Sequence, residues 1–226
     1  MSQRLSIVIA GATGLVGQST LNTALDNESI SRVYSLSRRP IGIEHQKLTQ
    51  WLSPELNPPA INSLSDCPLV GVIALGTTLK KAGSKKKLHA VDVELVIKVA
   101  KNMQALGVQH IIVVSCLGAS TKARSHYLRC KGEMEMAMQQ LDMVKLTYMQ
   151  PGPLSGPREE QRIDEKLLQC VMKIINPFMV GALANYKPIE SIDVAHAIIH
   201  LATEQHVVKD KQVKRINTSQ MLALIR

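Results

Sequence analysis

The chain has 226 residues and a formal net charge of +9 at pH 7, with 45% apolar and only 3% aromatic residues. This length suits a single domain, spanning 1–226, with an aliphatic core. No run of about 18 apolar residues occurs, which excludes a membrane-spanning helix. The N-terminus runs straight into an apolar segment, so we expect no signal peptide. The four cysteines form no CxxC pair and have no zinc spacing. We therefore expect reduced thiols, a cytoplasmic location and no bound metal.

The positive charge is compatible with a nucleic acid, an anionic cofactor or simple solubility. Proteins that bind single strands usually add stacking aromatic side chains, and the one Trp, one Phe and four Tyr do not cluster with lysines. We therefore expect neither a nucleic acid nor a membrane as a partner. The segment 79–87 carries five lysines: Lys80, Lys81, Lys85, Lys86 and Lys87. It is either a solvated loop with a first helical turn or an electropositive lid over an anionic ligand.

A glycine-rich turn follows the first apolar run, 5–10, which is short, β-branched at its centre and typical of a buried parallel strand. A helix is expected at about 15–26, so the turn joins a strand to a helix N-terminus, where unpaired N–H groups attract phosphate. The spacing is GxxGxxG rather than the commoner GxGxxG. The alternative is a tight turn without a ligand. The residues expected to bind a cofactor pyrophosphate here are Gly11, Ala12, Thr13, Gly14, Leu15, Val16 and Gly17.

A second strand is expected at 32–37, followed by Ser37, Arg38 and Arg39. An acidic residue about 20 positions past the glycine turn would bind the ribose 2′-hydroxyl of NAD. This chain has instead a hydroxyl and two guanidinium groups, which bind phosphate. The pattern favours NADP over NAD. The alternative is a solvated arginine pair at the end of a strand.

The rest of the chain alternates between strand and helix patterns, which indicates an α/β fold with a doubly wound parallel sheet. Ligands of such sheets bind at the carboxyl ends of the strands. Further cofactor contacts are therefore expected from Leu75, Gly76, Thr77, Thr78, Pro151 and Gly152. The expected strands are a weak one at 46–52 and clear ones at 69–75, 109–115 and 144–149; the expected helices are 88–106, 127–141 and 192–203, with 154–226 mostly helical.

Three polar residues form a candidate catalytic group. Ser115 ends an expected strand, and Tyr127 and Lys131 are spaced so that they share one face of a helix. A neighbouring ammonium group lowers the pKa of a phenol, so the tyrosine could exchange a proton with a carbonyl or alcohol. The serine could fix the same substrate oxygen. The alternative is that Tyr127 begins a buried stripe and Lys131 is solvated.

These motifs resemble the short-chain dehydrogenase/reductase superfamily. The segments 151–158 and 189–195 resemble its extended, epimerase-like branch. Within that branch, 75–78, 81–83 and 127–133 look most like the Tat-interacting-protein type of NAD(P)H-binding oxidoreductase. The resemblance covers nearly the whole chain. It implies a Rossmann-type fold, bound NADPH and a Ser/Tyr/Lys site. The smaller substrate-side part, 151–226, is too short for a full nucleotide-sugar domain, which disfavours a sugar-nucleotide epimerase.

The leading hypothesis is therefore an NADPH-dependent oxidoreductase acting on an unidentified small carbonyl or alcohol compound. Tyr127 would be the general acid/base, and Lys131 would also hold the nicotinamide ribose. The alternative is an NADPH-binding regulatory or sensor protein without significant turnover. Nucleic-acid binding through 80–87 is the least favoured function. The superfamily resemblance also makes a homodimer plausible.

Overall fold

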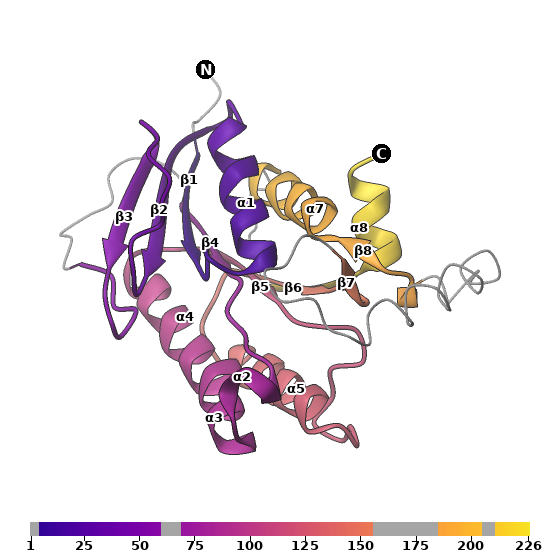
Figure 1. The fold of residues 1–226 in the computed structure, drawn as a ribbon. Helices are drawn as coiled ribbons and strands as arrows, with labels where there is room; N and C mark the ends of the chain where they lie inside the picture. Colours follow the sequence, from indigo (N-terminus) through magenta and orange to yellow (C-terminus); the bar gives the residue numbers. More distant parts are fainter. Residues whose placement is uncertain (1–4, 60–68, 156–184, 205–210) are drawn as a thin grey trace.

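The computed structural model describes residues 5–59, 69–155, 185–204 and 211–226 (Figure 1). Within these ranges, seven parallel strands form one sheet in the order β3-β2-β1-β4-β5-β6-β9. This arrangement confirms the predicted doubly wound α/β fold. The strands are β1 (Leu5–Ala10), β2 (Ile30–Ser37), β3 (Leu48–Leu52), β4 (Leu69–Ile73), β5 (His110–Val114), β6 (Lys145–Gln150) and β9 (Gln212–Asn217).

Helices cover both faces of the sheet (Figure 1). One face carries α1 (Leu15–Asp26), α7 (Ser191–Thr203) and α8 (Thr218–Leu224). The other carries α2 (Leu79–Ala82), α3 (Lys85–His89), the π-helical turn η1 (Ala90–Leu95), α4 (Val96–Ala105) and α5 (His126–Met138). A short second sheet pairs β7 (Leu154–Ser155) with β8 (Ile189–Glu190).

The central strands are buried on both faces because each face is covered by helices. In β1, every residue is buried. Ile7 and Ile9 belong to the core beneath α1 and α7, whereas Val8 and Ala10 belong to the core beneath α4 and α5. This period of two explains why the strand has an unbroken apolar sequence rather than an alternating one.

The strand order reverses beside β1. The chain runs outward from β1 through β2 to β3 and then crosses back to β4 on the other side of β1. The Ala74 N–H donates to the Ala10 carbonyl at 2.8 Å, which holds the two strand ends together where the order reverses. Open α/β sheets bind their ligands in the crevice at such a point.

Two predictions about secondary structure are wrong. The sequence predicts a mostly helical segment over 154–226, but within it 212–217 form strand β9, which pairs with β6 at the edge of the sheet. The single helix expected at 88–106 is divided into α3, η1 and α4, with a six-residue π turn in the middle. Residues 156–184, most of the predicted substrate-side part, lie outside the described residues. No helix among the described residues is long and apolar enough to cross a membrane.

Candidate active site

The glycine turn follows β1 and leads into α1, as its sequence predicts. Gly11 has a φ of +92°, a left-handed conformation that favours glycine, and a Cβ there would lie 2.6 Å from the Ala74 carbonyl oxygen. A Cβ on Gly17 would overlap the Gly11 carbonyl. These two glycines are therefore required by packing within the protein itself.

Gly14 differs from its two neighbours. It is exposed, with a φ of −83°, and a Cβ there would meet protein atoms only at 3.4 Å or more. Gly14 is also the N-cap of α1, and no side chain caps this helix. The first-turn N–H groups of a helix attract anions when they lack side-chain partners. The surface above Gly14 therefore fits a phosphate group.

The predicted 2′-phosphate residues lie at the carboxyl end of β2. Ser37 is buried, and its hydroxyl donates to the Arg39 carbonyl at 2.8 Å. Arg38 and Arg39 are exposed. Ser37 thus shapes the turn, and the two guanidinium groups are accessible to a ligand at the same sheet edge as the glycine turn.

The turn after β4 holds Leu75 to Thr78 at the neighbouring strand end. Thr78 caps α2 by accepting a hydrogen bond from Lys81 N at 3.2 Å. The Thr77 N–H donates to the Asp92 carboxylate at 2.9 Å. Gly76 is exposed, and a Cβ there would lie 3.3 Å from Asp92 Oδ1. The conformation of this turn is therefore fixed by Asp92, which lies in η1.

Tyr127 and Lys131 lie on one face of α5, as predicted. Tyr127 is 38% exposed, so it does not begin a buried stripe. Lys131 is 3% exposed, so it is not solvated; its Nζ lies 5.9 Å from the centre of the Tyr127 ring. The Lys131 ammonium pairs with Asp92 Oδ1 at 2.9 Å and lies 3.4 Å from the Val114 carbonyl. The ammonium thus sits at the carboxyl end of β5, close to the tyrosine.

Ser115 follows β5, but its hydroxyl is bound elsewhere. It donates to the buried Glu135 carboxylate at 2.6 Å, and the Gln150 side-chain amide donates to the same oxygen at 2.7 Å. Arg215 pairs with the other Glu135 oxygen at 2.9 Å. This network joins β5, α5, β6 and β9 beside the site.

Cys116 lies beside Tyr127, a position that the sequence reasoning missed. The Tyr127 hydroxyl is within hydrogen-bonding reach of the Cys116 thiol, and Lys131, Glu135 and Asp92 all act on it electrostatically. Burial is the largest influence and raises the pKa of the Cys116 thiol to about 11. Cys116 is therefore a neutral thiol at physiological pH, suited to hydrogen bonding rather than to nucleophilic attack.

Pro151 and Gly152 follow β6 at the same edge. The Pro151 carbonyl accepts from Leu117 N at 2.9 Å, and the Gly152 N–H donates to Thr218 Oγ1 at 2.9 Å. A Cβ on Gly152 would lie 2.6 Å from the Asn185 carbonyl oxygen. The conformation of this segment is thus set by contacts within the protein, and its contact with a cofactor stays a prediction.

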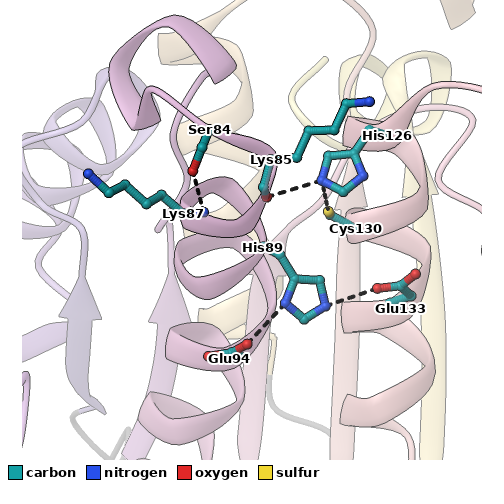
Figure 2. A network of polar contacts seen from close by, with 8 residues as sticks. All are labelled: Ser84, Lys85, Lys87, His89, Glu94, His126, Cys130 and Glu133. Carbon is teal, nitrogen blue, oxygen red and sulfur yellow. Dashed lines mark hydrogen bonds and ion pairs between the residues drawn. The ribbon is translucent and has the colours of Figure 1, made fainter.

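The helix α3, which carries Lys85, Lys86 and Lys87, packs on α5 through His89 (Figure 2). His89 places one ring nitrogen 3.1 Å from Glu94 and the other 3.1 Å from Glu133 on α5. His89 therefore bridges a glutamate of η1 and a glutamate of α5. His126 on α5 bonds the Lys85 carbonyl at 3.1 Å. The five lysines themselves are exposed on α2 and α3.

No group of three His, Cys, Asp or Glu side chains within the described parts of the chain is arranged to hold a metal ion. The arrangement instead offers an exposed phenol above a buried ammonium, at the sheet edge that also carries the N-terminus of α1, which no side chain caps. Such a site could exchange a proton with a ligand bound at the sheet edge.

The family model described as HIM1 matches residues 30–181. A protein named "Protein fmp52, mitochondrial" from Emericella nidulans is 30% identical over 79% of this chain and 76% of its own length. The "Protein FMP52, mitochondrial" of Debaryomyces hansenii is 28% identical over 98% of this chain and 99% of its own length. These mitochondrial relatives contradict the expectation of a cytoplasmic protein.

Several solved structures share the fold. A putative NAD-dependent epimerase/dehydratase from Bacillus halodurans has a TM-score of 0.63 and 18% identity, and the match covers 98% of both chains. The protein MoeE5, solved in complex with UDP-glucose and NAD, has a TM-score of 0.62 and 14% identity over 96% of this chain and 80% of its own. At these identities the likeness establishes the Rossmann-type fold alone.

Proposed function

This chain belongs to the HIM1 family, and on that premise we propose that it is an NADP-dependent oxidoreductase acting on a small carbonyl or alcohol compound. The observation that carries the proposal is the placement of Tyr127 directly above the buried ammonium of Lys131, at the sheet edge that also presents the glycine turn. The narrower resemblance to the Tat-interacting-protein type is part of this proposal.

A nicotinamide dinucleotide fits the residues at this edge. Its pyrophosphate would lie over Gly14 and the first turn of α1, where space and unpaired N–H groups coincide. Similar solved structures hold NAD, which supports a dinucleotide of this kind. The two exposed arginines, Arg38 and Arg39, favour the 2′-phosphorylated form. The segments Leu75–Thr78 and Pro151–Gly152 would line the nicotinamide side.

The bound dinucleotide would supply or accept the hydride. Tyr127 would donate a proton to the carbonyl oxygen in reduction, or take one from the alcohol in oxidation. Lys131, held beneath the ring, would stabilise the tyrosinate by its charge and bind the nicotinamide ribose. The Ser115 hydroxyl donates its hydrogen bond to Glu135, so towards a substrate it could act only as a hydrogen-bond acceptor. In this role it would accept a hydrogen bond from a substrate hydroxyl.

The test is consumption of NADPH by the purified protein with a panel of aldehydes, ketones and quinones. Turnover that is lost in Tyr127→Phe, with NADPH binding retained, supports the proposal. Binding of NADPH without turnover across the panel would instead favour the second candidate, a cofactor-binding regulatory protein. The exposed surface of α2 and α3, tied to α5 by His89, is the specific feature that favours this candidate, because it could report cofactor binding to a partner.

A further inference from the structure

A buried ion pair joins Lys131 to Asp92, a residue without a role in the proposed proton transfer. Asp92 is fully buried, Lys131 is 3% exposed, and Asp92 Oδ1 lies 2.9 Å from Lys131 Nζ. The two residues come from different elements, η1 and α5. Removing two charges from water costs several kcal/mol unless their geometry and hydrogen bonds are good. A buried ion pair that served packing alone could be replaced by apolar residues of similar volume without loss of stability.

The Asp92 carboxylate connects the two halves of the site. One oxygen pairs with Lys131, and the other accepts the Thr77 N–H at 2.9 Å in the turn after β4. Asp92 projects from the six-residue π turn η1. Turns of this type are rare and occur frequently at functional sites. The same carboxylate therefore fixes both the turn expected to bind the cofactor and the lysine under Tyr127.

The other charged groups around Lys131 are already engaged. Glu135, on the same helix, is paired with Arg215 at 2.9 Å. Cys116 follows β5 and is a neutral thiol, because its pKa is raised to about 11. The element α3 contacts α5 through Lys85 and His89, which bond His126 and Glu133 rather than Lys131 (Figure 2). Among the described residues, Asp92 is thus the counter-ion in contact with this ammonium.

We propose that Asp92 is a positioning residue that keeps the Lys131 ammonium protonated and fixed beneath Tyr127. A buried ammonium without a counter-ion gives up its proton readily. With Asp92 present, the positive charge persists at 5.9 Å from the centre of the Tyr127 ring. Asp92 therefore acts through Lys131 to promote ionisation of Tyr127. The proton-transfer role of Tyr127 rests on the proposed function, whereas the charge relationship does not.

The test compares Asp92→Asn with Glu94→Gln. The amide of Asp92→Asn carries no charge and has one acceptor oxygen, so it can accept from Thr77 N or contact Lys131 through that oxygen, but not both. Glu94 lies on the same π turn, is 68% exposed and pairs with His89, so Glu94→Gln removes one charge without touching Lys131. The readout is the ultraviolet titration of tyrosinate, with the Tyr127 signal isolated by subtracting the matching Tyr127→Phe protein.

The titration midpoint of Tyr127 is expected to rise by about one pH unit in Asp92→Asn and to stay at the wild-type value in Glu94→Gln. An unchanged midpoint, or a fall caused by unmasking a full positive charge on Lys131, overturns the inference. If Asp92→Asn fails to fold, the double variant Asp92→Asn/Lys131→Gln leaves no unpaired charge. Its midpoint should lie above the wild-type value, because the ammonium that favours the tyrosinate is absent, and an unchanged midpoint contradicts the coupling.

This titration needs neither cofactor nor substrate, so it separates the two claims. A protein without turnover can still show the rise. A protein with turnover but an unchanged midpoint keeps the oxidoreductase function and loses the role of Asp92. Where turnover is found, Asp92→Asn should lower kcat about tenfold and shift the pH profile of kcat upward, with KM little changed.

Discussion

The hydroxyl of Ser115 donates a 2.6 Å hydrogen bond to the buried carboxylate of Glu135. Sequence motifs place Ser115 beside a substrate, but the structure shows that its proton already has an acceptor within the protein. Glu135 receives two further donors, from Gln150 and Arg215. The serine is thereby oriented by a four-element network, and its remaining lone pairs define what it can offer a ligand.

Neutralising Glu135 should weaken the fold and release Ser115. In Glu135→Gln, Arg215 and the serine lose a charged acceptor in a buried position, which should lower the free energy of unfolding by about 1–3 kcal/mol. Chemical denaturation measures this loss. Glu133→Gln is the matched control, because Glu133 is on the same helix but 39% exposed, and exposed pairs contribute little. Equal free energies of unfolding for the two variants would show that the contacts of Glu135 do not stabilise the fold.

The glycines of the turn should separate into packing and binding positions. Gly17→Ala places a Cβ against the Gly11 carbonyl, so it should destabilise the fold by about 1–3 kcal/mol. Gly14→Ala meets no close protein atom, so it should cost only about 0.5–1 kcal/mol through poorer capping. It should nevertheless weaken NADPH binding, because its Cβ would occupy the proposed phosphate position. Thermal unfolding and a cofactor titration, run on both variants, distinguish the two effects. Unimpaired binding in Gly14→Ala would remove the phosphate from this turn.

His110 should make the fold sensitive to acid. Burial is the main cause, and nearby Lys145 and Lys214 add to it, so that the pKa of His110 falls from 6.5 to about 3. Between these values the unfolded chain binds a proton that the folded chain does not. The free energy of unfolding should therefore decrease as pH falls below 6.5, by at most about 1.4 kcal/mol per pH unit from this group.

The His110→Gln variant isolates this contribution. Its amide can keep a hydrogen bond with Thr147, which His110 contacts at 3.0 Å, but it does not titrate. The free energy of unfolding, measured by chemical denaturation between pH 7 and pH 4, should fall less steeply in the variant, by ~1 kcal/mol per pH unit. Parallel curves for the two proteins would show that His110 does not carry the effect.

Tyr127→Phe should leave the fold and NADPH binding intact. The ring is 38% exposed and keeps its position over Lys131 without the hydroxyl. Turnover with any substrate found in the panel should fall by at least about 100-fold, the contribution typical of a general acid. Loss of NADPH binding in this variant would instead assign Tyr127 to cofactor binding and remove it from proton transfer.

The central strands and the glycine turn were predictable because they follow local rules. The run from Leu5 to Ala10 is buried on both faces and is apolar throughout, so its pattern identifies it. Strand β9 has no such pattern. It lies at the sheet edge, and Gln212 and Val213 are exposed, so its sequence resembles a surface segment. Only the pairing with β6 makes it a strand, and tertiary pairing is invisible to local periodicity.

The proximity of Tyr127 and Lys131 was predictable, but the residues that hold them in place were not. Tyr127 and Lys131 share a helix, so their proximity follows from spacing. Asp92 reaches Lys131 from another element, η1, and Cys116 interacts with Tyr127 while the adjacent Ser115 bonds Glu135. The backbone at a strand end decides what each of two neighbouring side chains contacts, and this requires the three-dimensional structure.

Equilibrium titration of the purified protein with NADPH and with NADH tests the central claim most directly. Wild-type protein should bind NADPH at least about tenfold more tightly than NADH. Arg38→Asp should abolish that preference, because it replaces an exposed guanidinium at the end of β2 with a charge that repels a 2′-phosphate. Arg32→Asp, an equal charge change at an exposed position near the start of β2, should retain it. Failure to bind either nucleotide would contradict the account, and with it the proton-transfer role of Tyr127.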